Sequence, residues 1–257
     1  MLEGADYICD IGVAVSKDGI HFEKRDDVSP LFRKGEDAKY SYEDVNVVEY
    51  GGTYYLFANR WNWSDIQNPR EGGVFIATSK DLLHWDKVGL AFPQADCLHR
   101  NPCVLQNPHN QAVRVNGRFV MYLNYGLIAF SDDLLHWESE MVDQRWPGGE
   151  GCFALADYDP QNKDHILLFT GGHHTGYFYA VGEVLLDKNN LKKPITWLSR
   201  PALYPEERYP FEDGYSDDPD PRPVSDWRNT IFFTGLTLHD NRWWLYYGGS
   251  EYYTCLA

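Results

Sequence analysis

The chain has 257 residues, a net charge of −15 and an aromatic fraction of 16%. Such a charge repels polyanions, so we expect neither a nucleic acid nor an anionic membrane as a partner. No apolar run reaches the roughly 18 residues that a membrane span needs. The acidic N-terminus lacks the pattern of an export signal, and the five scattered cysteines predict reduced thiols. We therefore expect a cytoplasmic protein, or a periplasmic or secreted one if an export signal has been removed.

The first recognisable element is a turn motif within residues 1–30. An apolar strand, IGVAV, leads into the segment Ser16–Lys24, which reads SKDGIHFEK. The serine and aspartate side chains can bond to nearby backbone groups and hold a tight turn, and the His-Phe pair then begins a second strand. Two strands are therefore predicted here.

Residues 40–92 contain the same turn after a longer pattern. A β-branched strand around residues 42–48 is followed by a Gly-Gly turn, an aromatic strand and the strand GVFIAT, and then by SKDLLHWDK at Ser79–Lys87. Gly-Gly is a hairpin turn pair. The unit therefore reads as four antiparallel strands.

The pattern recurs twice more and begins a third time. Residues 99–140 carry an Asn-Gly hairpin and a third copy of the turn, SDDLLHWES, at Ser131–Ser139. Residues 149–198 repeat the strands but replace the turn with the sequence LLDK. After a loop rich in Pro and Asp at 199–228, residues 229–257 start another unit with an Asp-Asn hairpin.

Four strands at a period of about 50–60 residues are typical of a propeller blade. We therefore predict an all-β fold, a five-bladed β-propeller of four-stranded antiparallel blades, with almost no helix. Residues 1–257 are predicted to form a single domain whose first and last blades are incomplete in sequence. Either the termini share one blade or further strands lie outside this sequence.

Carboxyl and amide side chains precede the innermost strands, where a propeller has its central funnel. Glu43 and Asp44 stand before the strand of the second unit, Asn101 before the third and Glu150 before the fourth. Burial in a narrow funnel raises the pKa of a carboxyl group and lets it act as an acid near neutral pH. A surface hairpin cap is the alternative interpretation of Glu43 and Asp44.

These segments resemble glycoside hydrolase family 130, the five-bladed mannoside phosphorylases and mannosidases. Glu43-Asp44 followed by a glycine turn and Tyr-Tyr is similar to the family's Glu-Asp-Pro-Arg segment. The likeness continues along nearly the whole chain, through 16–22, 149–151, 179–187, 203–206, 211–212, 229–235 and 244–251. The resemblance implies a β-mannoside or mannan-derived oligosaccharide as substrate, with Asp44 as proton donor to the glycosidic oxygen.

The chain also departs from the family pattern. Val45-Asn46 replaces the family's Pro-Arg, Asn124 replaces an arginine of its phosphorylases, and the family's Tyr-His-Gly falls at 170–172 with His173 next to it. Binding phosphate in a funnel requires fixed cations, and most of them are replaced. We therefore predict a glycoside hydrolase with an inverting, carboxylate-assisted mechanism. The alternative is a phosphorylase that releases mannose 1-phosphate, for which Arg60, Arg70 or Arg100 could supply the cations.

Glu150 is the first candidate for the base that activates water, because glycines flank it and let the backbone approach a ligand closely. Glu212 and Glu251 are the other candidates for the base. The resemblance also implies sugar contacts near Glu251. Trp61 lies before a long insertion and could form a stacking platform for a sugar. The predicted substrate contacts are Glu43, Asn46, Arg60, Trp61, Asn101, Asn124, His173, Tyr247 and Glu251.

We predict no cofactor and no metal site, and a homo-oligomer is compatible with the sequence. An oligosaccharide is the expected partner, with inorganic phosphate under the phosphorylase alternative. A third hypothesis is a catalytically inactive propeller that only binds carbohydrate, because residues expected to be functional are replaced.

Overall fold

The computed structural model describes residues 9–32, 39–62, 72–92, 99–173, 179–206, 230–249 and 253–257. These residues contain no α-helix, so the predicted all-β class is confirmed. Within these ranges no helix has the length and apolar character that a bilayer crossing demands. The strands follow one another along the chain in the order that the predicted turns and hairpins indicate.

Residues 40–90 form one antiparallel sheet in chain order, from β3(Tyr40–Tyr50) through β4(Thr53–Asn62) and β5(Gly73–Ser79) to β6(Trp85–Leu90). The next sheet region follows the same plan with β7(Cys103–Gln106), β9(Arg118–Tyr122), β10(Leu127–Ser131) and β11(Glu138–Met141), with the short β8(Arg114–Val115) paired to β9. The third region is β12(Glu150–Ala156), β13(His165–His173), β14(Tyr179–Asp187) and β15(Asn190–Trp197). All three fall within the units predicted from the sequence or within one residue of them.

The first described hairpin of the chain contacts the last described sheet. The hairpin of β1(Ala14–Ser16) and β2(Phe22–Lys24) packs near the sheet of β16(Ile231–His239), β17(Arg242–Gly249) and β18(Tyr253–Leu256). Tyr246 Oη donates a hydrogen bond to the carbonyl of Gly19 at 2.8 Å, and its ring meets Phe22 edge-on at 5.9 Å. The single-domain arrangement with incomplete terminal blades stays a prediction.

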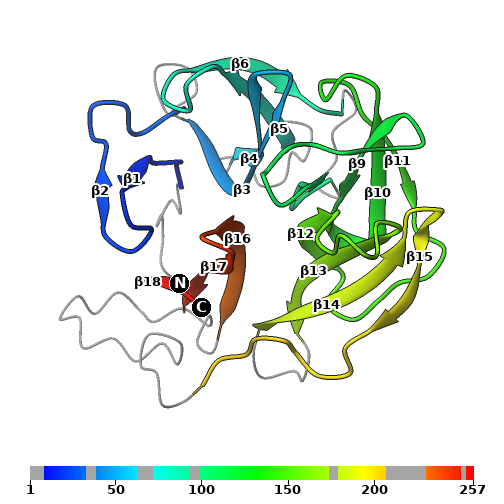
Figure 1. Cartoon of the computed structure of the whole chain (residues 1–257). Helices are drawn as coiled ribbons and strands as arrows, with labels where there is room; N and C mark the ends of the chain where they lie inside the picture. Colours follow the sequence, from blue (N-terminus) through cyan, green and yellow to red (C-terminus); the bar gives the residue numbers. More distant parts are fainter. Residues whose placement is uncertain are drawn as a thin grey trace, which may run out of the picture.

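The first strands of successive sheets meet around the middle of the molecule (Figure 1). β7 pairs in parallel with β12, and β3 contacts β7 while β12 and β3 both contact β16. Because each sheet runs outward from its first strand, residues at the start of these strands converge on one place. That convergence positions the candidate site.

The three Ser-x-Asp turns have one structure, as predicted. In each, the serine hydroxyl accepts backbone N–H groups at the second and third following residues, and one aspartate oxygen accepts the next two N–H groups. The other aspartate oxygen bonds to a histidine ring at 2.7–2.8 Å. The triplets are Ser16, Asp18 and His21; Ser79, Asp81 and His84; and Ser131, Asp133 and His136.

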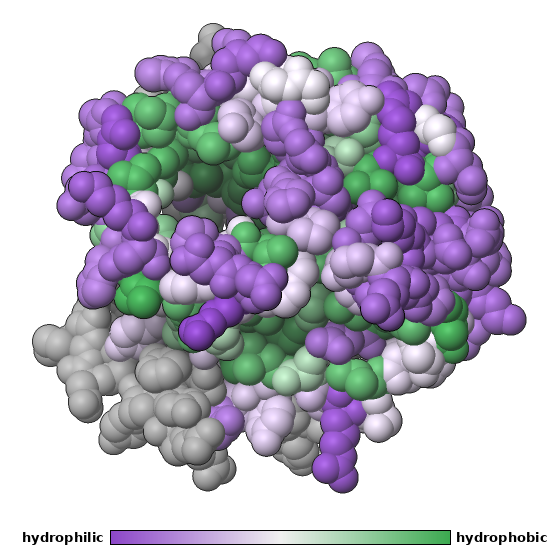
Figure 2. Space-filling view, viewed as in Figure 1, coloured by the Kyte–Doolittle hydropathy of each residue, from purple (hydrophilic) through white to green (hydrophobic). Residues whose placement is uncertain are grey.

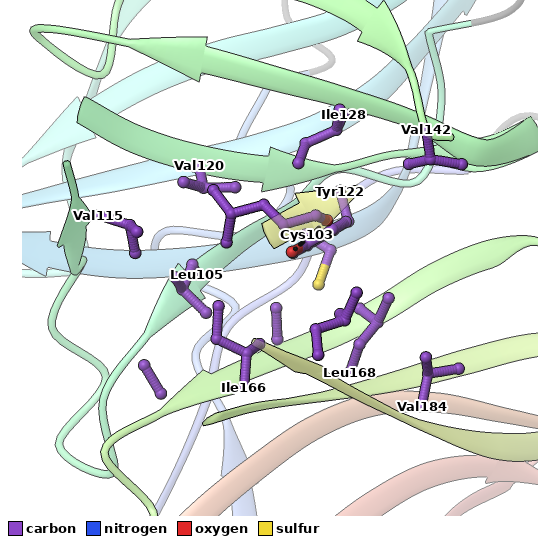
Figure 3. Close-up of a cluster of buried hydrophobic side chains, with 14 of the residues drawn as sticks. Cys103, Leu105, Val115, Val120, Tyr122, Ile128, Val142, Ile166, Leu168 and Val184 are labelled. Atoms are coloured by element: carbon purple, nitrogen blue, oxygen red, sulfur yellow. Dashed lines mark hydrogen bonds between the residues drawn. The ribbon is translucent and has the colours of Figure 1, made fainter. Parts of the chain in front are cut away.

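A large buried cluster lies between the β7–β11 and β12–β15 regions, which the β7–β12 pairing joins into one nine-stranded sheet (Figure 3). Cys103, Leu105 and Tyr122 from β7 and β9 face Ile166 and Leu168 from β13. These residues are fully buried, which matches strands whose apolar side chains alternate toward a shared core. The packing of one sheet on the next fixes the relative positions of β7 and β12, and therefore of the residues at their starts.

Candidate active site

A β-bulge places Asp44. The pairing of β3 with β4 runs regularly from the Gly51-Gly52 turn to Asn46 opposite Phe57, then shifts so that Glu43 lies opposite Asn59. The extra residue gives Asp44 a backbone φ of 54°, in the left-handed region that Asp tolerates better than most residues. Bulges bend a strand and re-aim its side chains. Here the bulge directs the Asp44 carboxyl among the first strands of the neighbouring sheets.

The pKa of Asp44 is raised from the ordinary value of 3.8 to about 7. Burial is the main cause, and the negative charges of Glu43 and Glu150 add to it. The charge of Arg100 and a hydrogen bond donated by Asn59 Nδ2 to Asp44 Oδ2 act in the opposite direction. At neutral pH the Asp44 carboxyl is therefore about half protonated, which is the state that a general acid needs.

Glu150, the first residue of β12, is the second carboxyl of the site. Its oxygens accept hydrogen bonds from Asn101 Nδ2 at 3.4 Å, from Asn124 Nδ2 at 3.3 Å and from the hydroxyl of Tyr179. Burial raises the pKa of Glu150, while the charge of Arg100 and the Asn124 donor oppose the rise. The three donors fix the carboxylate in one orientation.

Backbone contacts hold the donors of Glu150 in place. Asn101 adopts a left-handed backbone conformation, with a φ of 54°, just before β7. Asn124 opens the short 3-10 turn η4(Asn124–Gly126), and its backbone N–H donates to the carbonyl of Arg100 at 2.9 Å. Tyr179 comes from the start of β14. A Cβ on Gly151 would stand 3.2 Å from Tyr122, so glycine there permits close packing of β12 on β9.

Two buried carboxamides connect the carboxyl groups. Asn59 Nδ2 also lies 3.3 Å from Asn101 Oδ1, and the backbone N–H of Asn101 donates to Asn59 Oδ1 at 2.8 Å. Asn59 is fully buried and Asn101 nearly so. A continuous chain of hydrogen bonds therefore runs from Asp44 through Asn59 and Asn101 to Glu150.

Glu43, Trp61 and Arg100 form a partly exposed cluster beside the carboxyl pair. Trp61 Nε1 donates to Glu43 Oε1 at 2.6 Å, and the guanidinium of Arg100 lies 4.9 Å from the Trp61 ring centre. Arg100 Nη2 is 3.9 Å from Glu43 Oε1, with side-chain exposures of 36% for Arg100 and 27% for Glu43. An aromatic ring, a cation and an anion are thus presented together.

A small cavity of about 20 Å³ that opens to solvent borders Asp44. The space-filling view shows a hollow above and to the left of the centre, with apolar residues inside it and polar residues around it (Figure 2). Apolar walls with a few polar groups are typical of small-ligand sites. The cavity is lined by Asp44, Val45, Asn101, Pro102, Gly151, Cys152, Phe232 and Phe233.

Comparison with known proteins identifies the family. The model of glycoside hydrolase family 130, described as beta-1,4-mannooligosaccharide phosphorylase, matches residues 4–257. The chain belongs to glycoside hydrolase family 130.

Individual relatives agree with this assignment. A 1,2-beta-oligomannan phosphorylase of Thermoanaerobacter sp. (strain X514) is 28% identical over 95% of this chain and 76% of its own length. The solved structure of a glycosyl hydrolase from Bacteroides ovatus superposes with a TM-score of 0.71 at 25% identity, covering 96% of this chain and 74% of that one. A structure from a study of family 130 hydrolases that target β-1,2 mannosidic linkages in Candida mannan shares the fold, with a TM-score of 0.73 at 23% identity over 96% of this chain and 74% of that one.

Several predicted site residues of this family 130 chain converge in the structure. Asp44, Glu150, Asn101 and Asn124 form one hydrogen-bonded group, and Glu43 and Trp61 stand beside it. Their roles in catalysis or substrate binding stay predictions.

Three other predicted contacts have different surroundings. Asn46 is buried, and its Oδ1 accepts the backbone N–H of Val104 at 3.1 Å, which ties β3 to β7. The guanidinium of Arg60 stacks on the Tyr40 ring at 4.4 Å. Tyr247 lies in the buried cluster with Phe233.

Part of the prediction falls on residues that the structure does not describe. Glu212 and Glu251 lie outside the described ranges. His173 is the last residue of β13, where its backbone pairs with Tyr179, but its side chain is not described.

Sequence reasoning missed Asn59 and Tyr179. Counting the hairpin register outward from Gly51-Gly52 would have placed Asn59 opposite Asp44, so a signal for Asn59 existed. No local pattern points to Tyr179, because it reaches Glu150 across β13.

Proposed function

We propose that this family 130 chain is a five-bladed β-propeller that cleaves β-mannosidic bonds, with Asp44 as the general acid. Five groups of strands arranged around one centre support the propeller: β1–β2, β3–β6, β7–β11, β12–β15 and β16–β18 (Figure 1). The observation that carries the enzymatic proposal is the Asp44 carboxyl, buried at the cavity with a pKa of about 7.

Phosphorolysis is the reaction that the comparisons favour. The family is described as a mannooligosaccharide phosphorylase, and the Thermoanaerobacter relative is a 1,2-beta-oligomannan phosphorylase. We therefore place the alternative drawn from the sequence ahead of hydrolysis. The proposed substrate is a β-1,2-linked manno-oligosaccharide, with inorganic phosphate as acceptor and mannose 1-phosphate as product.

The charge of Arg100 supports a phosphate site. Its guanidinium acts electrostatically on both Asp44 and Glu150, lowering the pKa of each. It is partly exposed, and among the described residues its ion-pair partner is the Glu43 carboxylate at 3.9 Å, so it retains donors for an anionic ligand. In this proposal Arg100 binds phosphate while Asp44 protonates the departing glycosidic oxygen. Direct transfer and relay through a substrate hydroxyl would both use that proton.

Glu150 favours hydrolysis as a second candidate function. A carboxylate held by three donors near the general acid could accept a proton from water, and its negative charge would repel a phosphate dianion. In this reaction Glu150 would be the base of an inverting displacement. The two candidate functions thus assign opposite effects to the charge of Glu150.

The deciding experiment is incubation with β-1,2-mannobiose and longer oligomers, with and without phosphate, followed by chromatography of mannose and mannose 1-phosphate. Phosphorolysis predicts mannose 1-phosphate and no cleavage without phosphate. Hydrolysis predicts mannose at a rate independent of phosphate. Ligand binding without turnover under either condition would overturn the enzymatic proposal and favour the carbohydrate-binding hypothesis.

The matched variant for this test is Glu150→Gln, which keeps the shape of the side chain. If Glu150 is the general base of hydrolysis, Glu150→Gln should lower the hydrolytic rate by about 10²–10⁴-fold. In a phosphorylase its neutralisation should leave phosphorolysis within about tenfold and tighten phosphate binding.

A further inference from the structure

Asn59 is a buried side chain of β4 to which neither the sequence nor the comparisons give a role. Its carboxamide makes three contacts: Nδ2 with Asp44 Oδ2 and Asn101 Oδ1, and Oδ1 with the backbone N–H of Asn101. A fully buried amide whose oxygen and nitrogen are both engaged at a carboxyl pair is more than a packing residue.

The backbone of Asn101 determines which way the Asn59 amide points. A backbone N–H can only donate, so the atom that it meets at 2.8 Å must be the oxygen of Asn59. The NH₂ group is then the atom that faces Asp44 Oδ2. Because an NH₂ group cannot accept a hydrogen bond and donates better to an unprotonated carboxyl oxygen than to a hydroxyl oxygen, it favours Oδ2 as the unprotonated oxygen of Asp44.

We propose that Asn59 is a positioning residue for the general acid: it holds Asp44 Oδ2 as an acceptor and thereby places the acidic proton on Oδ1. The same amide engages Asn101, which contacts Glu150, so one side chain orients both carboxyl groups. Among the described residues, Asp44 Oδ1 has no hydrogen-bond partner, which leaves its proton available to a ligand in the cavity.

Loss of Asn59 has a predictable electrostatic sign. The donated hydrogen bond stabilises ionised Asp44 and lowers its pKa, so its removal raises that pKa further. In the part of the chain that the structure describes, the other groups that interact with Asp44 are Glu43 on β3, Arg100 before β7, and Glu150 and Cys152 on β12. Those groups remain in place when only Asn59 is changed.

The experiment compares Asn59→Ala and Asn59→Asp with the wild type. The titration of Asp44 is followed by ¹³C NMR of aspartate carboxyls, and Asp44→Asn assigns the signal. The Asp44 titration should move upward by about 1 pH unit in Asn59→Ala and by more in Asn59→Asp, where a second carboxylate replaces the donor. Gln106→Ala, which removes a buried carboxamide of β7 that has no hydrogen bond to either carboxyl among the described residues, is the matched control for lost packing.

The kinetic readout rests on the proposed function. The basic limb of the kcat–pH profile should move to higher pH by the same amount in Asn59→Ala, with a plateau about tenfold lower because the proton is no longer directed. Unchanged Asp44 titration in Asn59→Ala, with a stability loss like that of Gln106→Ala, would overturn the inference. If wild type cleaves no mannoside, the proposed function fails, while the titration still decides the role of Asn59. If Asn59→Asp does not fold, Asn59→Ala decides alone.

Discussion

Replacing Asp44 by Asn should remove most turnover and stabilise the protein at alkaline pH. Asn keeps the size of the side chain and can still accept the hydrogen bond from Asn59, but it has no acidic proton. We expect turnover to fall by about 10²–10⁴-fold with little change in ligand binding. With a pKa of 3.8 only about one Asp44 in 1,600 would be protonated at pH 7, whereas a pKa of about 7 gives about half.

The stability effect follows from the same pKa. When the pKa of a carboxyl group is higher in the folded state than in the unfolded state, the protein is most stable below the unfolded-state pKa, here near pH 4. The protein then loses stability as the pH rises toward the folded-state pKa of about 7. The difference between 3.8 and about 7 corresponds to about 4 kcal/mol once both states are ionised. The amide introduced by Asp44→Asn does not titrate, so the variant should exceed wild type by about 4 kcal/mol at pH 8 and by about 2 kcal/mol at pH 5.

Urea denaturation at pH 5 and pH 8 measures this difference, and product chromatography measures turnover. Equal stabilities at both pH values would show that Asp44 is not a buried carboxyl group of raised pKa. Full activity in Asp44→Asn would show that the proton comes from elsewhere. If both expectations hold, the folded protein loses stability by burying the Asp44 charge, and the same burial keeps the acid protonated at neutral pH.

Three further predictions concern the turns, the glycine packing and the rim of the site. Ser131→Ala removes a buried hydroxyl that accepts two backbone N–H groups of its turn. Urea denaturation should therefore show a free energy of unfolding lower by about 1 kcal/mol, with unchanged turnover. A fall in turnover at equal stability would contradict a structural role. Gly172→Ala should lower the free energy of unfolding by about 1–3 kcal/mol, because its Cβ would collide with the backbone of Gly148. An unchanged free energy of unfolding would refute this contact. Trp61→Phe keeps a ring against Arg100 but removes the donor to Glu43, so KM for the oligosaccharide should rise about tenfold with kcat nearly unchanged; an effect confined to kcat would argue against a binding role.

The candidate base shows where sequence reasoning reached and where it stopped. The flanking glycines predict Glu150 as the base, yet Gly151 serves the packing of β12 on Tyr122, and no described atom lies within 4 Å of a Cβ added to Gly149. The residue is at the site for another reason: it begins the first strand of its sheet, and such strands meet at the centre. The repeat pattern, and not the flanking glycines, is therefore what correctly predicts that Glu150 lies at the site.

The sequence by itself determined the all-β class, the strand units and the repeated turns, because each depends on residues that are neighbours in the chain. Ser131 and Asp133 hold their turn through groups at most three residues away. The tertiary structure decided what surrounds the carboxyl groups. Asp44 acquires its pKa from burial and from charges on other strands, and Glu150 is held by Asn101, Asn124 and Tyr179 from three separate elements. Desolvation and Coulomb interactions depend on distance in space, and only the packing of the sheets around their common centre sets those distances.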